Sequence, residues 1–157
     1  MKLYTGVLLF LAGITCIASA QEYFVKDERN LQHGFSAVYM VNNYVAPRLQ
    51  LSAGMIERAT GNRQYVLASH YNGQHRLRAR EIRMQIDGEV VILDRIVNRQ
   101  YTDNNEIVGF EISGDILKKI GTADRVRVQI RGNRFIEKEI DRIYISRFGD
   151  FYRQHLR

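Results

Sequence analysis

The sequence predicts a mainly β, α+β domain, built as an antiparallel β-sandwich or curved sheet of about eight strands with a short helix and a covering C-terminal helix. Three observations carry this prediction. Several strand-length segments alternate apolar and polar residues, two-residue turn signals separate neighbouring segments, and apolar spacing changes to three and four residues only near the C-terminus. A closed barrel is the next architecture that fits.

The N-terminus has the order of a cleavable secretory signal, with Lys2, an apolar run over residues 7–12 and small residues at 18–20. We expect cleavage after Ala20 and a periplasmic or secreted protein. Cys16 lies within the signal, and its neighbours do not match a bacterial lipoprotein site. The mature chain then has no cysteine, which excludes disulfides and thiolate chemistry, and it has no segment that predicts a transmembrane helix.

Residues 21–34 are polar, and we expect a loosely ordered N-terminal arm ahead of a single domain over 35–157. Within that domain, residues 35–41 and 49–57 have the length and composition of strands. The stretch 62–99 then predicts two successive hairpins, because its dipeptides Asn72-Gly73 and Asp87-Gly88 both suit two-residue type I′ turns.

The register of the first hairpin follows from its turn. If residues 72 and 73 form the loop, His70 lies directly opposite His75. The other face of this hairpin is then aromatic on one strand and basic on the other. It would bring together Tyr65, Tyr71, Arg76, Arg78 and Arg80.

The second hairpin pairs apolar residues across its turn. Met84 is expected opposite Val91, and Ile82 opposite Leu93. Because the apolar positions change parity between the first and second hairpins, we expect a β-bulge near residues 80–81.

The C-terminal half alternates strands and helices. The expected elements are a polar loop at 102–105, a strand at 107–112, a helix at 114–120 capped by Ser113, strands at 125–130 and 135–138, and a helix at 141–156. The last helix carries an aromatic stripe of Tyr144, Phe148, Phe151 and Tyr152, which we expect to cover the core. Gly149 opposes this helix by about 1 kcal/mol.

The charge balance favours anionic partners. The chain has 23 Lys and Arg residues against 17 Asp and Glu residues, for a formal net charge of +6. Stacking on tyrosine and forked arginine contacts would recognise an anionic glycan or a lipid head group, so we take the five residues of the Arg/Tyr face as the candidate ligand-binding site. The export signal argues against nucleic acid.

Catalytic and metal chemistry have weaker signals. His70 and His75 would supply two metal ligands, but zinc or copper would need a third, and Glu81 lies on the same face only if the bulge leaves its direction unchanged. No HxH or HExxH spacing occurs, so no metal or cofactor is assigned. The chain also has no GxSxG elbow, P-loop or dinucleotide fingerprint, and no catalytic residue is assigned. We expect the loop and strand acids to be solvated charges, namely Asp87, Asp94, Asp103, Glu106 and Glu111.

Three functions fit these observations. The first is a non-enzymatic exported cell-envelope binding module, monomeric or weakly dimeric, that recognises another envelope protein or an anionic envelope component through the Arg/Tyr face. The second is a small periplasmic hydrolase or metal-dependent enzyme that uses His70 and His75. The third is a periplasmic inhibitor or immunity-type protein, which shares every sequence feature of the first.

Overall fold

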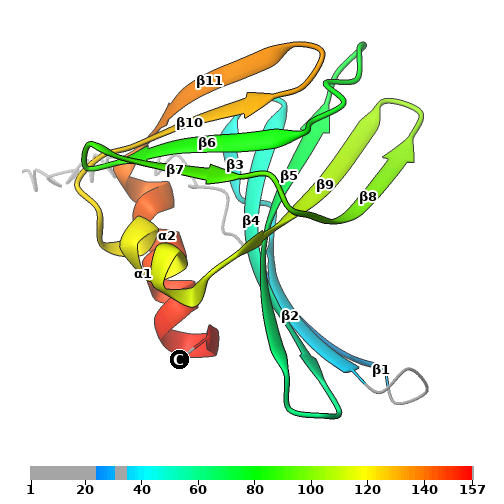
Figure 1. Ribbon diagram of the computed structural model, residues 1–157, viewed down its shortest axis with the longest axis vertical. Coiled ribbons are helices and arrows are strands. Elements are labelled where there is room, and N and C mark those ends of the chain that lie inside the picture. The colour runs from blue at the N-terminus through cyan, green and yellow to red at the C-terminus, as the bar shows by residue number, and fades with distance from the viewer. Residues whose placement is uncertain (1–23, 31–34, 157) are drawn as a thin grey trace, which may run out of the picture.

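The computed structural model describes residues 24–30 and 35–156. These residues form eleven strands in two antiparallel sheets, two helices and a final π-helical turn (Figure 1). The predicted mainly β class, with antiparallel sheets and a C-terminal helix, is confirmed, although more strands form than the eight expected. The predicted signal and its cleavage site lie outside the described residues. None of the helices in the described ranges has both the length and the apolarity needed to cross a bilayer.

The larger sheet has seven strands. They are β1 (Phe24–Asn30), β2 (Phe35–Val41), β3 (Tyr44–Ala46), β4 (Leu49–Arg58), β5 (Arg63–Asn72), β8 (Ile96–Thr102) and β9 (Asn105–Ile112). Their order is β1-β2-β4-β5-β9-β8, and β3 pairs with β4. β1 lies within the segment 21–34 for which we expect a loosely ordered arm, and it pairs with β2 along its whole length.

The smaller sheet has four strands, β6 (Glu81–Ile86), β7 (Glu89–Leu93), β10 (Val126–Arg131) and β11 (Phe135–Ile140), in the order β11-β10-β6-β7. Its β6–β7 hairpin confirms the prediction, since Met84 pairs with Val91. Asp87 and Gly88 adopt φ of 48° and 92°, and positive φ at both positions is what a type I′ turn requires.

The helices are α1 (Gly114–Thr122) and α2 (Arg142–Phe151), and the π-helical turn η1 (Tyr152–Leu156) continues α2. Ser113 caps α1 as predicted, because its hydroxyl accepts the Ile116 N–H at 3.2 Å. The two helices lie together beside the sheets (Figure 1). Phe148 and Phe151 of the predicted aromatic stripe are buried in the core, while Tyr144 and Tyr152 are half-buried against it.

Gly149 is explained by the contact between the two helices. A Cβ atom on Gly149 would lie 2.6 Å from the carbonyl oxygen of Gly121, and one on Gly121 would lie 2.4 Å from the Cα of Gly149. The backbones of α1 and α2 therefore meet at these two positions, and only glycine fits there. The propensity cost of Gly149 is offset by the close packing that it allows.

A single core lies between the sheets and the helices. Its largest fully buried side chains come from both sheets and both helices, and include Phe110, Phe151, Leu67, Ile82 and Leu117. β10 shows why the alternation was informative, since its valine and isoleucine side chains are buried and Arg127 is exposed.

The predicted first hairpin is wrong. β5 pairs with β4 on one side and with β9 on the other, so neither of its edges is free for residues 74–80. Neither Asn72 nor Gly73 has the positive φ of a type I′ turn. Residues 73–80 instead leave the larger sheet and cross to the smaller one, where β6 begins. We call this segment the crossover.

The rest of the 62–99 stretch also divides between the sheets. The residues after the second turn form β7 in the smaller sheet, and the chain then returns to the larger sheet as β8. The break falls at Asp94 and Arg95. The parity change near residues 80–81, interpreted as a bulge, marks the end of the crossover and the start of β6.

Candidate functional site

The crossover is held in place by a buried carboxylate. Glu106 of β9 is only 2% exposed, and its two oxygens accept the backbone N–H of Arg78 at 2.8 Å and of Ala79 at 2.6 Å. Charge-assisted bonds to backbone amides are among the stronger hydrogen bonds in proteins. The expectation that Glu106 is a solvated surface charge is therefore wrong.

Other contacts fix both sides of the crossover. The Arg99 guanidinium of β8 donates to the Ala79 carbonyl at 2.8 Å. The Leu77 carbonyl accepts the Asn133 N–H at 2.8 Å, so the β10–β11 turn packs on the same segment. Leu77 and Ala79 are buried, whereas the alternate residues Arg76, Arg78 and Arg80 are exposed.

Arg76 lies over an aromatic ring that the sequence prediction did not include. Its guanidinium carbon is 4.9 Å from the ring centroid of Tyr101 in β8, a cation–π distance. Tyr101 pairs with Glu106 across the Asp103-Asn104 turn. We expected only a polar loop at 102–105. Had a two-residue turn at residues 103 and 104 been predicted from the sequence, it would have indicated that Tyr101 lies at this end of the sheet.

The predicted aromatic partners lie elsewhere. Tyr71 is half-buried at the end of β5, where its hydroxyl would be 2.2 Å from a Cβ atom on Gly73. Tyr65 is six residues away on the same strand, about 20 Å at the usual rise, and its ring lies against Gly114 of α1. The shared face predicted for the two tyrosines with Arg76, Arg78 and Arg80 does not form.

The histidines are also separated. The Nδ1 of His70 lies 3.2 Å from Gln50 Nε2, and its Nε2 lies 3.3 Å from Asn105 Oδ1. These partners suit a ring that accepts at Nδ1 and donates from Nε2. His75 is exposed in the crossover, not opposite His70 as predicted. Among the described residues, no three His, Cys, Asp or Glu side chains gather as a metal site.

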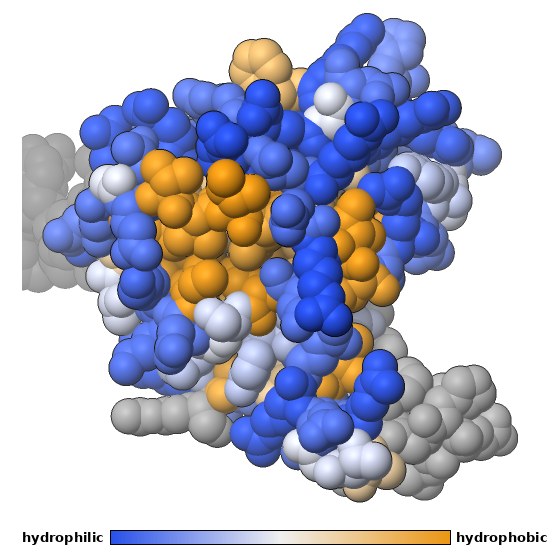
Figure 2. Space-filling model, in the orientation of Figure 1, coloured by the Kyte–Doolittle hydropathy of each residue, from blue (hydrophilic) through white to orange (hydrophobic). Residues whose placement is uncertain are grey.

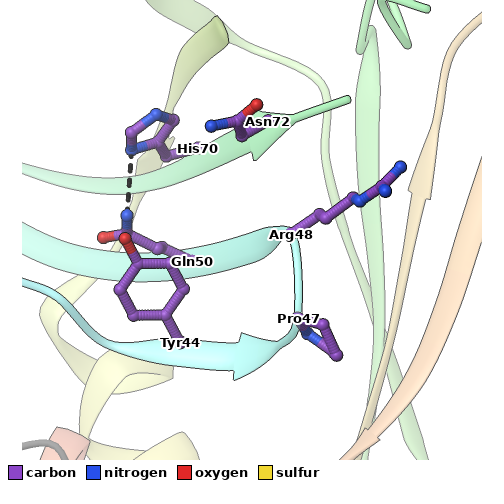
Figure 3. A pocket seen from close by; sticks show the side chains of 6 residues that line it. All are labelled: Tyr44, Pro47, Arg48, Gln50, His70 and Asn72. Atoms are coloured by element: carbon purple, nitrogen blue, oxygen red, sulfur yellow. Dashed lines mark hydrogen bonds between the residues drawn. The ribbon is translucent and has the colours of Figure 1, made fainter. Parts of the chain in front are cut away.

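His70 lines a half-open pocket of about 250 Å³ on the larger sheet, shown in Figure 3. Its lining is Tyr44, Pro47, Arg48, Gln50, His70 and Asn72. Asn72 donates its N–H to the Arg48 carbonyl at 2.9 Å and is the last residue before the crossover. The pocket and the crossover therefore lie at the same end of the larger sheet.

Five arginines on or beside the crossover have no carboxylate partner among the residues that the structure describes. We call Arg76, Arg78, Arg80, Arg99 and Arg134 the arginine cluster: the first three lie on the crossover, Arg99 donates to it, and Arg134 lies in the β10–β11 turn that packs on it. Arg131, whose carbonyl accepts the Arg80 N–H, is left out because it is paired with Glu81. All five are exposed, and none forms an ion pair with an acid of residues 24–30 or 35–156. Figure 2 shows a largely hydrophilic surface at the upper right, over this region.

The outer face of the smaller sheet is different, because its arginines are paired. Arg125 lies 2.7 Å from Glu139, and Arg131 lies 3.3 Å from Glu81. The hydrogen bond and charge of Arg125, with a further contribution from Arg127, lower the pKa of Glu139, and Glu139 in turn raises the pKa of Arg125. These guanidinium charges are already balanced by carboxylates.

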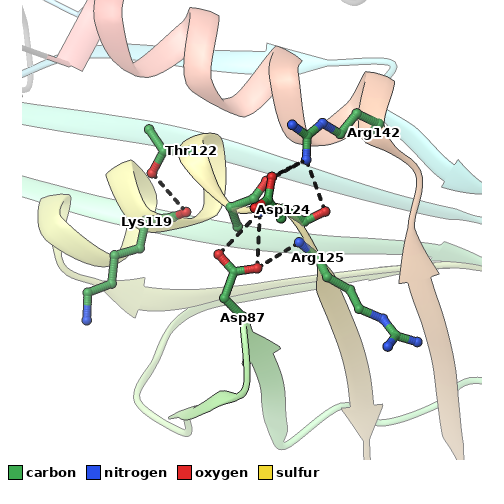
Figure 4. A network of polar contacts seen from close by, with 7 residues as sticks. Asp87, Lys119, Thr122, Asp124, Arg125 and Arg142 are labelled. Carbon is green, nitrogen blue, oxygen red and sulfur yellow. Dashed lines mark hydrogen bonds and ion pairs between the residues drawn. The ribbon is translucent and has the colours of Figure 1, made fainter.

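A polar network at the β6–β7 turn is likewise internally paired (Figure 4). The Asp87 carboxylate accepts the backbone N–H of Asp124 at 3.1 Å and of Arg125 at 2.8 Å. Arg142 of α2 lies 2.7 Å from the Asp124 carboxylate. The network joins the turn to the start of β10 and to α2, which is a structural role.

Comparison of the chain with models of protein families, with curated protein sequences and with solved structures finds no match in any of the three.

Proposed function

We propose that the protein is an exported, non-enzymatic binding module of the cell envelope whose arginine cluster holds an anionic group of a glycan or a lipid head group. The proposal retains the function expected from the sequence, with export after cleavage near Ala20. It moves the binding surface from a sheet face to the crossover and the turns beside it.

The observation that carries the proposal is the separation of charges. Arginines of the smaller sheet are paired with acids, whereas those of the arginine cluster have no carboxylate partner among the described residues. An unpaired guanidinium offers a full charge and forked donors, which suit phosphate, sulfate or carboxylate oxygens. Several of them around one anchored segment favour a polyanion.

The adjoining pocket favours a glycan as the carrier of that anion. It combines the Tyr44 ring with the amide side chains of Gln50 and Asn72. An aromatic ring packs against the apolar face of a sugar, and amides exchange hydrogen bonds with hydroxyl groups. Arg48 adds one positive charge at the edge of the pocket.

The alternative enzyme function has no observation in its favour. It relied on His70 and His75 acting as a pair, but His70 is bonded to Gln50 and Asn105 while His75 is in the crossover. An inhibitor or immunity-type function would use the same exposed surfaces, and it becomes the leading hypothesis if no polyanion binds.

Binding to defined polymers tests the proposal. Titration calorimetry with dextran sulfate and polygalacturonate, against neutral dextran, measures affinity for sulfate-bearing and carboxylate-bearing chains. Substitution of Arg76, Arg78 and Arg80 by glutamine should weaken polyanion binding at least tenfold. Three exposed ionic contacts of about 0.5–1 kcal/mol each reach the roughly 1.4 kcal/mol that corresponds to a factor of ten.

A matched variant removes the same charge from the paired face, by substitution of Arg125, Arg127 and Arg131 with glutamine. It should retain most of the affinity, and binding by the unmodified protein should weaken as salt rises. Circular dichroism checks that both variants are folded. Equal losses in the two variants would show that only net charge matters, which contradicts the proposal.

A further inference from the structure

β7 is an edge strand whose second side has no strand beside it in the described ranges. It ends the order β11-β10-β6-β7 and pairs only with β6. Proteins usually protect such edges with lysine, proline or a bulge, because free backbone groups recruit other strands. β7 has the sequence Glu-Val-Val-Ile-Leu and carries none of these devices.

The hairpin register shows which backbone groups are free. A two-residue turn makes Ile86 and Glu89 a hydrogen-bonded pair, and the pattern then alternates along the strands. Asp87 donates its N–H on the β10 side, to the carbonyl of Arg125 just before β10 at 3.0 Å, which fits this parity. Val90 and Ile92 therefore direct their N–H and C=O groups toward the open edge.

The same two residues expose apolar side chains. Val90 is 58% exposed and Ile92 is 48% exposed, on the outer face of the sheet. The large hydrophobic side chains that are exposed in the described residues are Tyr44, Val90, Ile92, Tyr101, Phe135 and Ile143. Among these, Val90 and Ile92 are the two that lie on the same strand. Figure 2 shows an apolar patch over β7 and the space between it and α1. Patches of this kind mark interaction sites.

We propose that this edge binds a second copy of the chain, with the two β7 strands antiparallel about a two-fold axis through Val91. That axis places Val90 opposite the partner's Ile92, and Ile92 opposite the partner's Val90. Since all four residues direct backbone groups to the shared edge, the pairing forms four hydrogen bonds and joins the two small sheets into one.

The side chains and charges suit the same arrangement. Each β-branched side chain meets an apolar partner across the new strand pair. Glu89 is the only charged residue of β7, and it is held by Lys119 of α1 at 2.9 Å. In the two-fold register it lies opposite the partner's Leu93, so no carboxylate faces another carboxylate. A second copy is the occupant that uses the edge symmetrically.

Sedimentation velocity of the purified protein over a concentration series tests the proposal. The expected result is a reversible dimer, whose dissociation constant rises at least tenfold when Val90 and Ile92 are both replaced by lysine. Lysine would then lie opposite lysine across the axis. Phe135→Lys is the matched control, because Phe135 is 67% exposed on the other edge strand of the same sheet, and it should leave the dimer unchanged.

Cross-linking tests the register. In a chain whose Cys16 is replaced by serine, Val91→Cys places two thiols directly opposite each other on the axis, within disulfide reach. Val90→Cys places them two residues apart on opposite strands, which is too far. Oxidation should therefore link the first variant and not the second.

Three results would overturn the proposal. The unmodified protein stays monomeric at every concentration, the double lysine variant dimerises as tightly as the unmodified protein, or Val90→Cys cross-links as readily as Val91→Cys. Thermal unfolding of each variant confirms that the loss of dimer is not a loss of fold.

Discussion

Removal of the Glu106 carboxylate should destabilise the protein more than removal of any exposed acid. Glu106 is buried, and its two oxygens accept the N–H groups of Arg78 and Ala79. Glu106→Ala leaves both amides without this acceptor and opens a cavity under the crossover. Glu106→Gln keeps one acceptor oxygen and loses the negative charge.

The magnitude follows from the two bonds. A hydrogen bond to a charged group contributes about 1.5–3 kcal/mol, and burial of the carboxylate costs part of that gain. We therefore expect Glu106→Ala to lower the free energy of unfolding by about 2–4 kcal/mol. We expect about half that loss for Glu106→Gln.

Urea unfolding followed by far-UV circular dichroism measures these changes. Glu137→Ala, which removes an exposed carboxylate from the outer face of the smaller sheet, should change the free energy by less than about 0.5 kcal/mol. Hydrogen exchange should also show faster exchange at the amides of Arg78 and Ala79 in the Glu106 variants. A Glu106→Ala protein as stable as the Glu137→Ala control would refute the reasoning.

Two further predictions concern the helix contact and the charged face. Gly149→Ala should lower the midpoint of thermal unfolding, although alanine favours a helix by about 1 kcal/mol, because its Cβ would meet the Gly121 carbonyl; a higher midpoint would contradict the close contact. For Glu139, whose folded pKa is lowered by Arg125, the stabilising interaction is present above the ordinary pKa of 4.5 and is lost as pH falls through the lower folded pKa. Carbon-13 NMR should therefore find the Glu139 midpoint below 4.5, and Arg125→Gln should raise it; an unchanged midpoint would exclude this ion pair.

Local features of the sequence were sufficient for elements whose partners are close in the chain. The β6–β7 hairpin could be predicted to its register, because the turn at Asp87 and Gly88 determines which residues pair. The capping of α1 by Ser113 is equally local. In each case the contact is made within a few residues.

The first hairpin could not be predicted in this way. Asn72 and Gly73 have the right residues for a type I′ turn, but β5 is a central strand, and β4 and β9 occupy both of its sides. β9 is more than thirty residues further along the chain, so no local pattern shows that it competes with residues 74–80. The pairing of distant strands overrides the turn preference.

The burial of Glu106 and the contact at Gly149 were missed for the same reason. Both depend on what a distant segment places beside them, the crossover in one case and α1 in the other. The predicted alternation of buried and exposed residues is found in the crossover, although the segment is not a strand. Leu77 and Ala79 are buried and Arg76 is exposed. The basic row was thus correctly grouped, while its aromatic neighbours were not.

The hydrogen bonds that Glu106 accepts from the crossover lead to a last prediction, which rests on the proposed function. It distinguishes polyanion binding through net charge alone from binding that needs the arginines at fixed positions. Glu106→Gln raises the net charge by one, so an electrostatic field alone would strengthen binding to dextran sulfate. If affinity depends instead on the fixed spacing of the arginine cluster, a loosened crossover must bind the polyanion more weakly. The arginines then have to be ordered on binding, and the entropy lost in ordering them opposes binding. We expect the second result, with affinity reduced several-fold at constant salt and in a variant still folded by circular dichroism. Tighter binding would show that the arginines of the crossover act through their charge alone and that their fixed positions do not matter.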